Sequence, residues 1–271
     1  MGKMLARIMA GALLVAASAC SSADDAEKDP AVQYRKAIEQ LIDEDYLEAA
    51  TKFETVANTT LNPILTQLAT VRLGDALYFQ GKYAEAAEVY REFQAQFPNA
   101  ADVPHAAFMR GLCHVSKMPE DVWLLPPAES REMEDVVSAY EAFSLVVDRY
   151  PATYYALRSR PKLQEIVERR CRHHVYVASY YSRHDNPKGA VQRLEQALDL
   201  EVAEVERKHV GAAFQCATSP SNILFLARMA AQARDPRALE RARDAYKDNM
   251  GRYQNPERGL QEILALEVSK E

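Results

Sequence analysis

Apolar and small residues recur along this chain three or four positions apart, the spacing that places them on one face of an α-helix. The pattern is clearest over residues 67–100, where a glycine separates two such stretches and a proline follows the second. We expect Gly81 to end the first helix with a positive φ angle, and Pro98 to stop the second. Residues 67–100 therefore predict a hairpin of two antiparallel helices.

This hairpin resembles the tetratricopeptide repeat, a helix–turn–helix unit with a period of about 34 residues. Gly74 and Ala86 are expected to be small because the two helices cross closely there. The aromatic residues are expected to fill the space between neighbouring hairpins. The positions that carry the resemblance are Gly74, Leu77, Gly81, Tyr83, Ala86, Tyr90, Phe93 and Pro98.

The hairpin pattern recurs before and after this segment. DYLEAATKF, at residues 45–53, repeats KYAEAAEVY 37 residues earlier in the chain. A third unit begins near Pro104, and a fourth contains Ala178 and Ala197. Residues 155–171 are expected to form a helix between these two units, and residues 221–250 a degenerate fifth unit.

These recurrences predict an all-α fold, a right-handed α-solenoid of about five tetratricopeptide-like hairpins. The solenoid is expected over residues 31–250, with an insertion at 118–133 and a C-terminal helix or tail at 251–271. Residues 205–220 do not fit the period, and the sequence gives no prediction for them.

The first residues form a separate segment with the layout of an export signal. Lys3 and Arg7 precede an apolar run at residues 8–19, which is too short to span a bilayer as a helix. Small residues directly before Cys20 resemble a bacterial lipobox, in which the cysteine becomes the lipid-modified first residue of the mature protein. A signal peptide cut after Ala19, with Cys20 unmodified, is the alternative.

The lipobox predicts a removed signal peptide at 1–19 and a covalent diacylglycerol and acyl chain on Cys20, which together hold a protein stably on a membrane. Ser21 stands where Asp would resemble an inner-membrane retention signal, so the periplasmic face of the outer membrane is the expected location. The small and acidic residues 20–30 are expected to be a flexible tether.

Composition narrows the classes of function. The 271 residues carry 33 Lys and Arg against 39 Asp and Glu, a net charge of −6, which argues against nucleic acid as a partner. The sequence contains no HExxH, GxSxG, GxGxxG or GxxxxGK[ST] motif, and a solenoid surface rarely encloses a dry catalytic pocket. We therefore expect no catalytic residues, no metal site and no dissociable cofactor.

Three cysteines remain in the predicted solenoid: Cys113, Cys171 and Cys216. An oxidising compartment permits one disulfide among them, with three possible pairings. The favoured interpretation is that all three are small buried hydrophobic residues.

Two surfaces are candidates for binding other proteins. The concave face of a solenoid is lined by the first helix of each hairpin, and aromatic residues there suit an apolar peptide. The predicted groove for such a peptide consists of Tyr34, Leu68, Val71, Asp75, Tyr78, Phe79, His105 and Phe108. Residues 158–172 hold six Arg or Lys against two Glu, which indicates a surface for an acidic protein partner.

Longer motifs now point to one family. The segments FMRGLCHV (108–115), AYEAFSLVVDRYPATYYA (139–156) and VASYYSRHDNPKGAVQRLEQAL (177–198), behind a lipoprotein signal, resemble the BamD family of the outer-membrane β-barrel assembly machinery. The resemblance covers about residues 30–200.

The resemblance implies a non-enzymatic scaffold for the folding and insertion of outer-membrane β-barrel proteins. Its N-terminal repeats would receive unfolded precursors, and its C-terminal repeats would dock on the POTRA domains of the barrel-forming protein, with accessory lipoproteins as further partners. Arg193 matches a family arginine at that docking surface, where its guanidinium could pair with a carboxylate. We expect Arg169, Arg170 and Arg172 to contribute to the same docking.

Two alternatives remain at this point. The chain could be another periplasmic repeat lipoprotein, such as a pilotin for a pilus secretin or a cell-envelope coordination factor. It could also be a helical enzyme of the cell envelope, which would require an enclosed pocket with clustered titratable groups.

Overall fold

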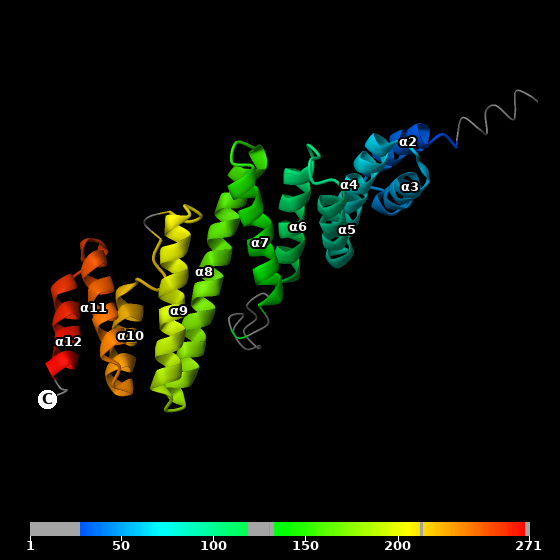
Figure 1. The fold of residues 1–271 in the computed structure, drawn as a ribbon. Helices are drawn as coiled ribbons and strands as arrows, with labels where there is room; N and C mark the ends of the chain where they lie inside the picture. Colours follow the sequence, from blue (N-terminus) through cyan, green and yellow to red (C-terminus); the bar gives the residue numbers. More distant parts are fainter. Residues whose placement is uncertain (1–27, 119–129, 131–132, 212–213, 269–271) are drawn as a thin grey trace, which may run out of the picture. The chain divides into compact units, whose positions relative to one another are not determined.

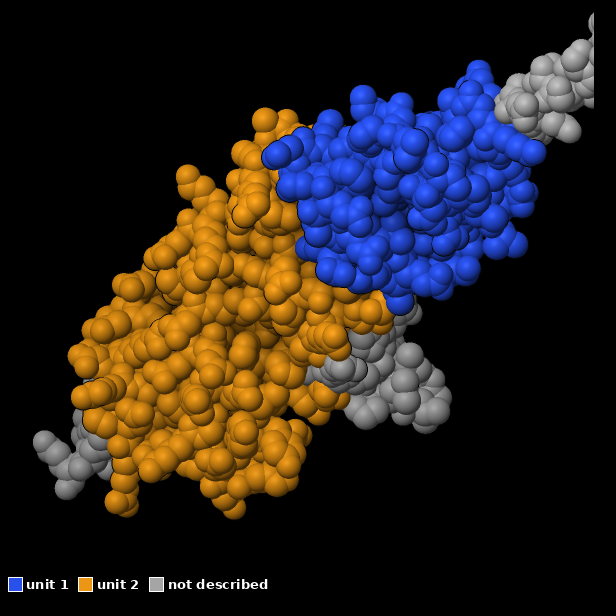
Figure 2. Space-filling model, turned by 45° about the vertical axis from the view of Figure 1, so that its right-hand side comes forward, with its two compact units in different colours: residues 1–113 blue, residues 114–271 orange. Residues whose placement is uncertain are grey.

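Helices make up all the regular structure in the described part of the chain. The computed structural model describes residues 28–118, 130, 133–211 and 214–268, and contains eleven α-helices there, α2 to α12 (Figure 1). The chain divides into two compact units, residues 1–113 and 114–271 (Figure 2). The all-α class and the hairpin repeat are confirmed. The predicted signal peptide, Cys20 and most of the tether and of the 118–133 insertion lie outside the described residues.

Unit 1 is a series of short helices in which each packs on the next. Helix α2 packs on α3, α3 on α4 and α4 on α5, as expected for hairpins joined by short turns. The helices are α2 (Pro30–Ile42), α3 (Tyr46–Thr59), α4 (Pro63–Phe79), α5 (Tyr83–Gln96) and α6 (Val103–Lys117), whose last residues belong to unit 2.

Capping residues and glycine set the ends of these helices. Asp29 and Asn62 precede Pro30 and Pro63, and their side chains accept hydrogen bonds from the first free backbone N–H groups of α2 and α4. Gly81 has a φ of 77°, the positive value expected at the end of α4.

The close helix crossing expected at Gly74 is present. A Cβ atom at this position would lie 2.6 Å from the ring of Tyr90, so α4 and α5 approach as they do only because Gly74 has no side chain. Tyr90, Phe53 and Phe93 are the largest fully buried side chains in the core of unit 1.

Unit 2 continues the hairpin pattern with longer helices. Helix α8 packs on both α7 and α9, α9 packs on α10, and α10 packs on both α11 and α12. The elements are α7 (Glu134–Arg149), α8 (Tyr154–Arg183), α9 (Pro187–Glu206), α10 (Pro220–Ala233), α11 (Pro236–Asn249), a 3₁₀ turn (Met250–Arg252) and α12 (Pro256–Val268).

Helix α8 differs from the prediction of two separate helices. The segment 155–171 and the first helix of the fourth repeat are one continuous helix of 30 residues. Pro161 lies inside this helix without ending it, because the apolar face of α8 continues on both sides and buries Ala156, Leu163 and Val167.

The favoured interpretation of the cysteines is wrong for two of them. Cys171 of α8 and Cys216 form a disulfide across 45 residues, while Cys113 is buried in unit 1. The pairing depends on the irregular segment 207–219, for which the helical period gave no prediction. Cys216 lies between α9 and α10, and its bond to Cys171 ties this part of the chain to α8.

Candidate functional site

A buried carboxylate joins three helices in unit 1. Asp75 of α4 is 5% exposed, and its Oδ1 accepts hydrogen bonds from the Tyr90 hydroxyl of α5 at 2.6 Å and from His105 Nε2 of α6 at 2.7 Å. Arg72 Nη1 donates to Asp75 Oδ2 at 2.6 Å. The Asp75 carboxylate therefore links α4, α5 and α6, and both of its oxygen atoms have hydrogen-bond partners.

The electrostatics of this cluster favour an Asp75 carboxylate that is ionised at neutral pH. Burial by itself would raise the pKa of the carboxyl, but the hydrogen bonds from His105, Tyr90 and Arg72 outweigh burial and lower it. Burial and the neighbouring Asp75 charge raise the pKa of Tyr90 well above its usual value. This cluster holds α4, α5 and α6 together through the hydrogen bonds that converge on the Asp75 carboxylate.

The predicted peptide groove is accessible at only some of its positions. The expectation that Val71 and Asp75 line a surface is wrong, because both side chains point into the core and are almost fully buried. The prediction placed both residues on the face of the helix opposite its packing positions, whereas in the structure they lie on the face that packs against the neighbouring helices. Phe108 is 9% exposed. The half-buried members are Tyr34, Leu68, Tyr78 and His105.

Phe79 is the most accessible of the predicted groove residues. Its ring is 54% exposed and stacks on Tyr46 of α3 with 5.3 Å between centroids. Tyr78 contacts both Phe79 and Tyr83, at centroid distances of 5.6 and 5.4 Å. We call these four residues the aromatic patch: Tyr46, Tyr78, Phe79 and Tyr83.

The surroundings of the aromatic patch were missed by the groove prediction. Gln80 Nε2 donates to the backbone oxygen of Tyr46 at 2.8 Å, which fixes the end of α4 against the start of α3. Ile42 and Leu47, at the turn between α2 and α3, are 73% and 66% exposed. The predicted groove consists of residues on the first helix of each hairpin, so it does not include Ile42 and Leu47 at the turn or Tyr46 on the second helix.

The four predicted docking arginines lie in different surroundings. Arg172 is exposed and donates to Glu168 at 2.8 Å, one turn earlier on α8. Arg170 lies over the ring of Tyr140, 4.4 Å from its centroid, a cation–π contact. Arg193 of α9 donates to Gln196 at 3.2 Å, and Arg169 is half-buried.

Two of these arginines share a positively charged surface with a histidine. Burial lowers the pKa of His174 to about 4, and the neighbouring charges of His173, Arg193 and Arg170 act in the same direction. We call Arg170, His174 and Arg193 the basic patch; it joins α8 to α9. Because His174 is neutral at pH 7, it adds no third positive charge beside the guanidinium groups of Arg170 and Arg193.

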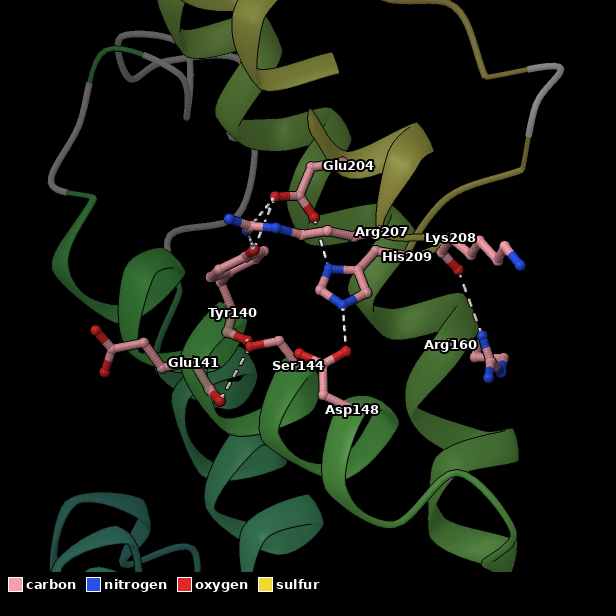
Figure 3. A network of polar contacts seen from close by, with 9 residues as sticks. All are labelled: Tyr140, Glu141, Ser144, Asp148, Arg160, Glu204, Arg207, Lys208 and His209. Atoms are coloured by element: carbon pink, nitrogen blue, oxygen red, sulfur yellow. Dashed lines mark hydrogen bonds and ion pairs between the residues drawn. The ribbon is translucent and has the colours of Figure 1, made fainter. Parts of the chain in front are cut away.

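The segment after α9 is held by buried carboxylates that sequence reasoning missed. Glu204 is 1% exposed and accepts hydrogen bonds from the Tyr140 hydroxyl and from His209 Nδ1, both at 2.7 Å (Figure 3). His209 Nε2 lies 2.8 Å from Asp148 Oδ1 of α7. Tyr140 therefore connects this network to the basic patch. Its hydroxyl donates to Glu204, and its ring contacts the guanidinium group of Arg170.

Glu201, one turn earlier on α9, holds the other end of the segment. Its side chain is 2% exposed and accepts hydrogen bonds from the backbone N–H groups of Cys216, Ala217 and Thr218, at 2.8, 2.6 and 3.2 Å. The Thr218 hydroxyl donates to the same carboxylate. The sequence signal was two acidic residues, at positions 201 and 204, on the otherwise apolar face of a helix.

No helix within the described residues is both long enough and apolar enough to cross a membrane.

Comparisons with known proteins relate the chain to one family. A family model described as "YfiO: Outer membrane lipoprotein" matches residues 26–202, which is more than half of the chain. BamD outer membrane protein assembly factors are among its relatives. That of Rickettsia prowazekii is 20% identical over 72% of this chain and 74% of the relative, and that of Neisseria gonorrhoeae is 24% identical over 73% and 77%.

Other matches are shorter or more distant. The BamD protein of Xylella fastidiosa is 27% identical over 44% of this chain and 41% of its own length. The kinesin light chain TPR-like repeats of Podosopora anserina align with 90% of this chain and 99% of theirs, with a TM-score of 0.39 and 14% identity. The family model and the curated relatives agree, and the chain belongs to the YfiO family of outer membrane lipoproteins, which includes the BamD assembly factors.

Proposed function

We propose that this chain is an outer-membrane protein assembly factor that works by binding other proteins and catalyses no reaction. In this role unit 1 binds unfolded β-barrel precursors at the aromatic patch, and unit 2 docks a POTRA-bearing barrel protein at the basic patch. The membership in the YfiO family, together with the assembly factors among its relatives, supports the general role.

The exposure of Phe79 is the observation that carries the precursor-binding half of the proposal. An aromatic ring that is 54% exposed and already stacked on Tyr46 is held in one orientation, so it can take another aromatic side chain at little cost in entropy. Ile42 and Leu47 extend the apolar surface beside it. Such a surface fits the aromatic residue at the end of a precursor strand.

Binding of a peptide tests this half directly. The probe is the C-terminal segment of an outer-membrane β-barrel protein, ending in an aromatic residue. Phe79→Ala combined with Tyr78→Ala is expected to weaken its affinity about tenfold, as loss of an aromatic anchor does. Leu264→Ala, an exposed leucine of unit 2, is the control. Unchanged affinity in the double variant with a normal circular dichroism spectrum would contradict the proposal.

The basic patch carries the docking half. Arg170 is oriented by the Tyr140 ring and Arg193 by Gln196, so both guanidinium groups are preorganised for acceptors on a partner. Because Tyr140 also bonds the buried Glu204, the packing of α7, α8 and α9 determines where Arg170 lies.

A pull-down from detergent-solubilised envelopes tests the docking. Arg193→Glu is expected to lose the POTRA-bearing protein, because reversal of a charge at an interface replaces attraction by repulsion. Arg91→Glu in unit 1 is the control, since Arg91 is exposed, is already paired with Glu88 and lies outside the predicted docking set. Recovery of secretin subunits in place of the barrel protein would contradict the proposal and favour a pilotin.

The proposed location depends on Cys20. Cys20→Ala is expected to release a folded protein from the membrane fraction, and mass spectrometry of the native protein is expected to find acyl chains on its first residue. Membrane association that survives the substitution, without such lipid, would contradict the anchor.

A further inference from the structure

The turn between α3 and α4 exposes aliphatic side chains to an unusual degree. Leu61 is 100% exposed and Ile64 is 69% exposed, and Asn62 and Pro63 between them are exposed too. We call Leu61–Ile64 the aliphatic tip. Two large hydrophobic residues presented at one turn are a feature of surfaces that contact an apolar partner.

The tip lies in the middle of an uncharged stretch. Residues 57–71 contain no Asp, Glu, Lys or Arg, although 27% of the chain is charged. This stretch can therefore approach an apolar phase without moving a charged group out of water. Desolvation of a charged group is the largest free-energy cost of such a transfer.

The polar groups around the tip are satisfied within the turn. Asn62 Oδ1 accepts from the backbone N–H groups of Ile64 and Leu65 at 3.0 and 3.4 Å, and Pro63 has no N–H group. The Asn62 N–H donates to the Thr60 hydroxyl at 3.2 Å. The hydroxyl groups of Thr55, Thr59, Thr66 and Thr70 each donate to a helix carbonyl four residues earlier. Polar groups that are already hydrogen-bonded within the protein lose little free energy when water leaves them.

The tip lies at the end of unit 1 where the tether enters. Helices α2, α3 and α4 alternate in direction, so the start of α2 at Pro30 shares an end with the α3–α4 turn (Figure 1). Nine residues lie between Cys20 and Pro30, and the ten Cα–Cα steps from one to the other span at most about 35 Å. A lipid on Cys20 would therefore keep this end of the unit near the bilayer.

We propose that the aliphatic tip inserts into the bilayer surface that holds the lipid on Cys20. The inference rests on the lipid anchor of the proposed function. The tether raises the local concentration of the bilayer at the tip, so two aliphatic side chains are enough for contact. The aromatic patch lies at the opposite end of α4, about 24 Å away by the rise of an α-helix, and so faces the periplasm for its clients.

Fluorescence quenching tests the insertion in the lipidated protein. Vesicles of phosphatidylethanolamine and phosphatidylglycerol carry nitroxide groups on their acyl chains, and an environment-sensitive fluorophore is attached at Leu61→Cys. We expect a blue shift and strong quenching at position 61. Ile42→Cys, at the opposite end of the α2–α3 hairpin and 73% exposed, is expected to show neither. Equal quenching at both positions, with the lipid confirmed by mass spectrometry, overturns the proposal.

Vesicle binding without the lipid separates the tip from the anchor. In the Cys20→Ala protein, Leu61→Ser with Ile64→Ser is expected to reduce vesicle affinity about tenfold, since two aliphatic side chains leave the membrane surface. Ile42→Ser with Leu47→Ser is expected to leave it unchanged. Equal effects of the two pairs of substitutions would overturn the insertion of the tip without contradicting the lipid anchor. A fluorophore at position 61 that responds to the precursor peptide and not to vesicles would also overturn it.

Discussion

The two units use the same helical hairpin but stabilise it by different means. Unit 1 keeps the repeat period, and its helices approach closely at Gly74 with one ionised hub at Asp75. Unit 2 departs from the period after α9, and there a disulfide and two buried carboxylates, Glu201 and Glu204, hold the irregular segment. Where the repeat supplies complementary faces, packing of small and aromatic residues is enough. Where it ends, covalent and charged contacts take its place.

Removal of the disulfide is expected to produce the largest difference between the units. Cys171→Ser with Cys216→Ser opens a loop of 45 residues, for which chain entropy gives a loss of about 4 kcal/mol. Urea unfolding followed by hydrogen exchange is expected to show the loss in unit 2 alone. Cys113→Ser is the control, and equal destabilisation of both units would mean that they unfold together.

Replacement of the hub in unit 1 is the next largest effect. Asp75→Asn removes the charge that accepts hydrogen bonds from Tyr90, His105 and Arg72, and is expected to cost about 2 kcal/mol. Because folding lowers the pKa of Asp75 from 3.8, its stabilisation is complete above that pH and is lost as pH falls through the folded value. The stability difference between variant and native protein should therefore shrink in acid; a constant difference from pH 7 to pH 2 would contradict an ionised hub.

Gly74→Ala tests the close approach of α4 and α5. The added methyl group would lie 2.6 Å from the Tyr90 ring, and the resulting overpacking is expected to cost about 1–2 kcal/mol in thermal unfolding. Gly251→Ala in unit 2 is the matched control, because an added Cβ there has no neighbour within 4 Å. Similar melting temperatures for the two variants would show that α5 can move away.

The smallest effect concerns His174 in the basic patch. Its pKa of about 4 is below the unfolded value of 6.5, so the unfolded chain takes up a proton first as pH falls. Native stability should decrease between pH 6.5 and 4 by roughly 1 kcal/mol after allowance for solvent screening. His174→Gln is expected to remove this part of the pH dependence, and an unaltered profile would place the histidine outside the patch.

The parts of the fold that could be predicted are those with a local cause. Gly81 and Pro98 mark helix ends because backbone sterics act within a few residues, and the spacing of Gly74 and Tyr90 follows from the period. The family was predicted from short motifs and is confirmed. The predictions of the client groove, of docking by Arg193 and of the lipid on Cys20 stay predictions.

The parts that failed depend on contacts between distant residues. Asp75 reads as a surface residue until Tyr90 and His105 are known to face it, because only partners make a buried carboxylate stable. The pairing of Cys171 with Cys216 requires the path of the segment after α9, which no period describes. The basic patch likewise combines residues of α8 and α9 that the count of charges in one stretch could not bring together.

The bond between Cys171 and Cys216 also determines when the protein can complete its folding. Synthesis takes place in a compartment that keeps thiols reduced, and the sulfur atoms can join only where an oxidant is present. At the proposed periplasmic location, unit 2 would acquire this bond only after export, and a chain without it would have a second unit that proteases open more easily.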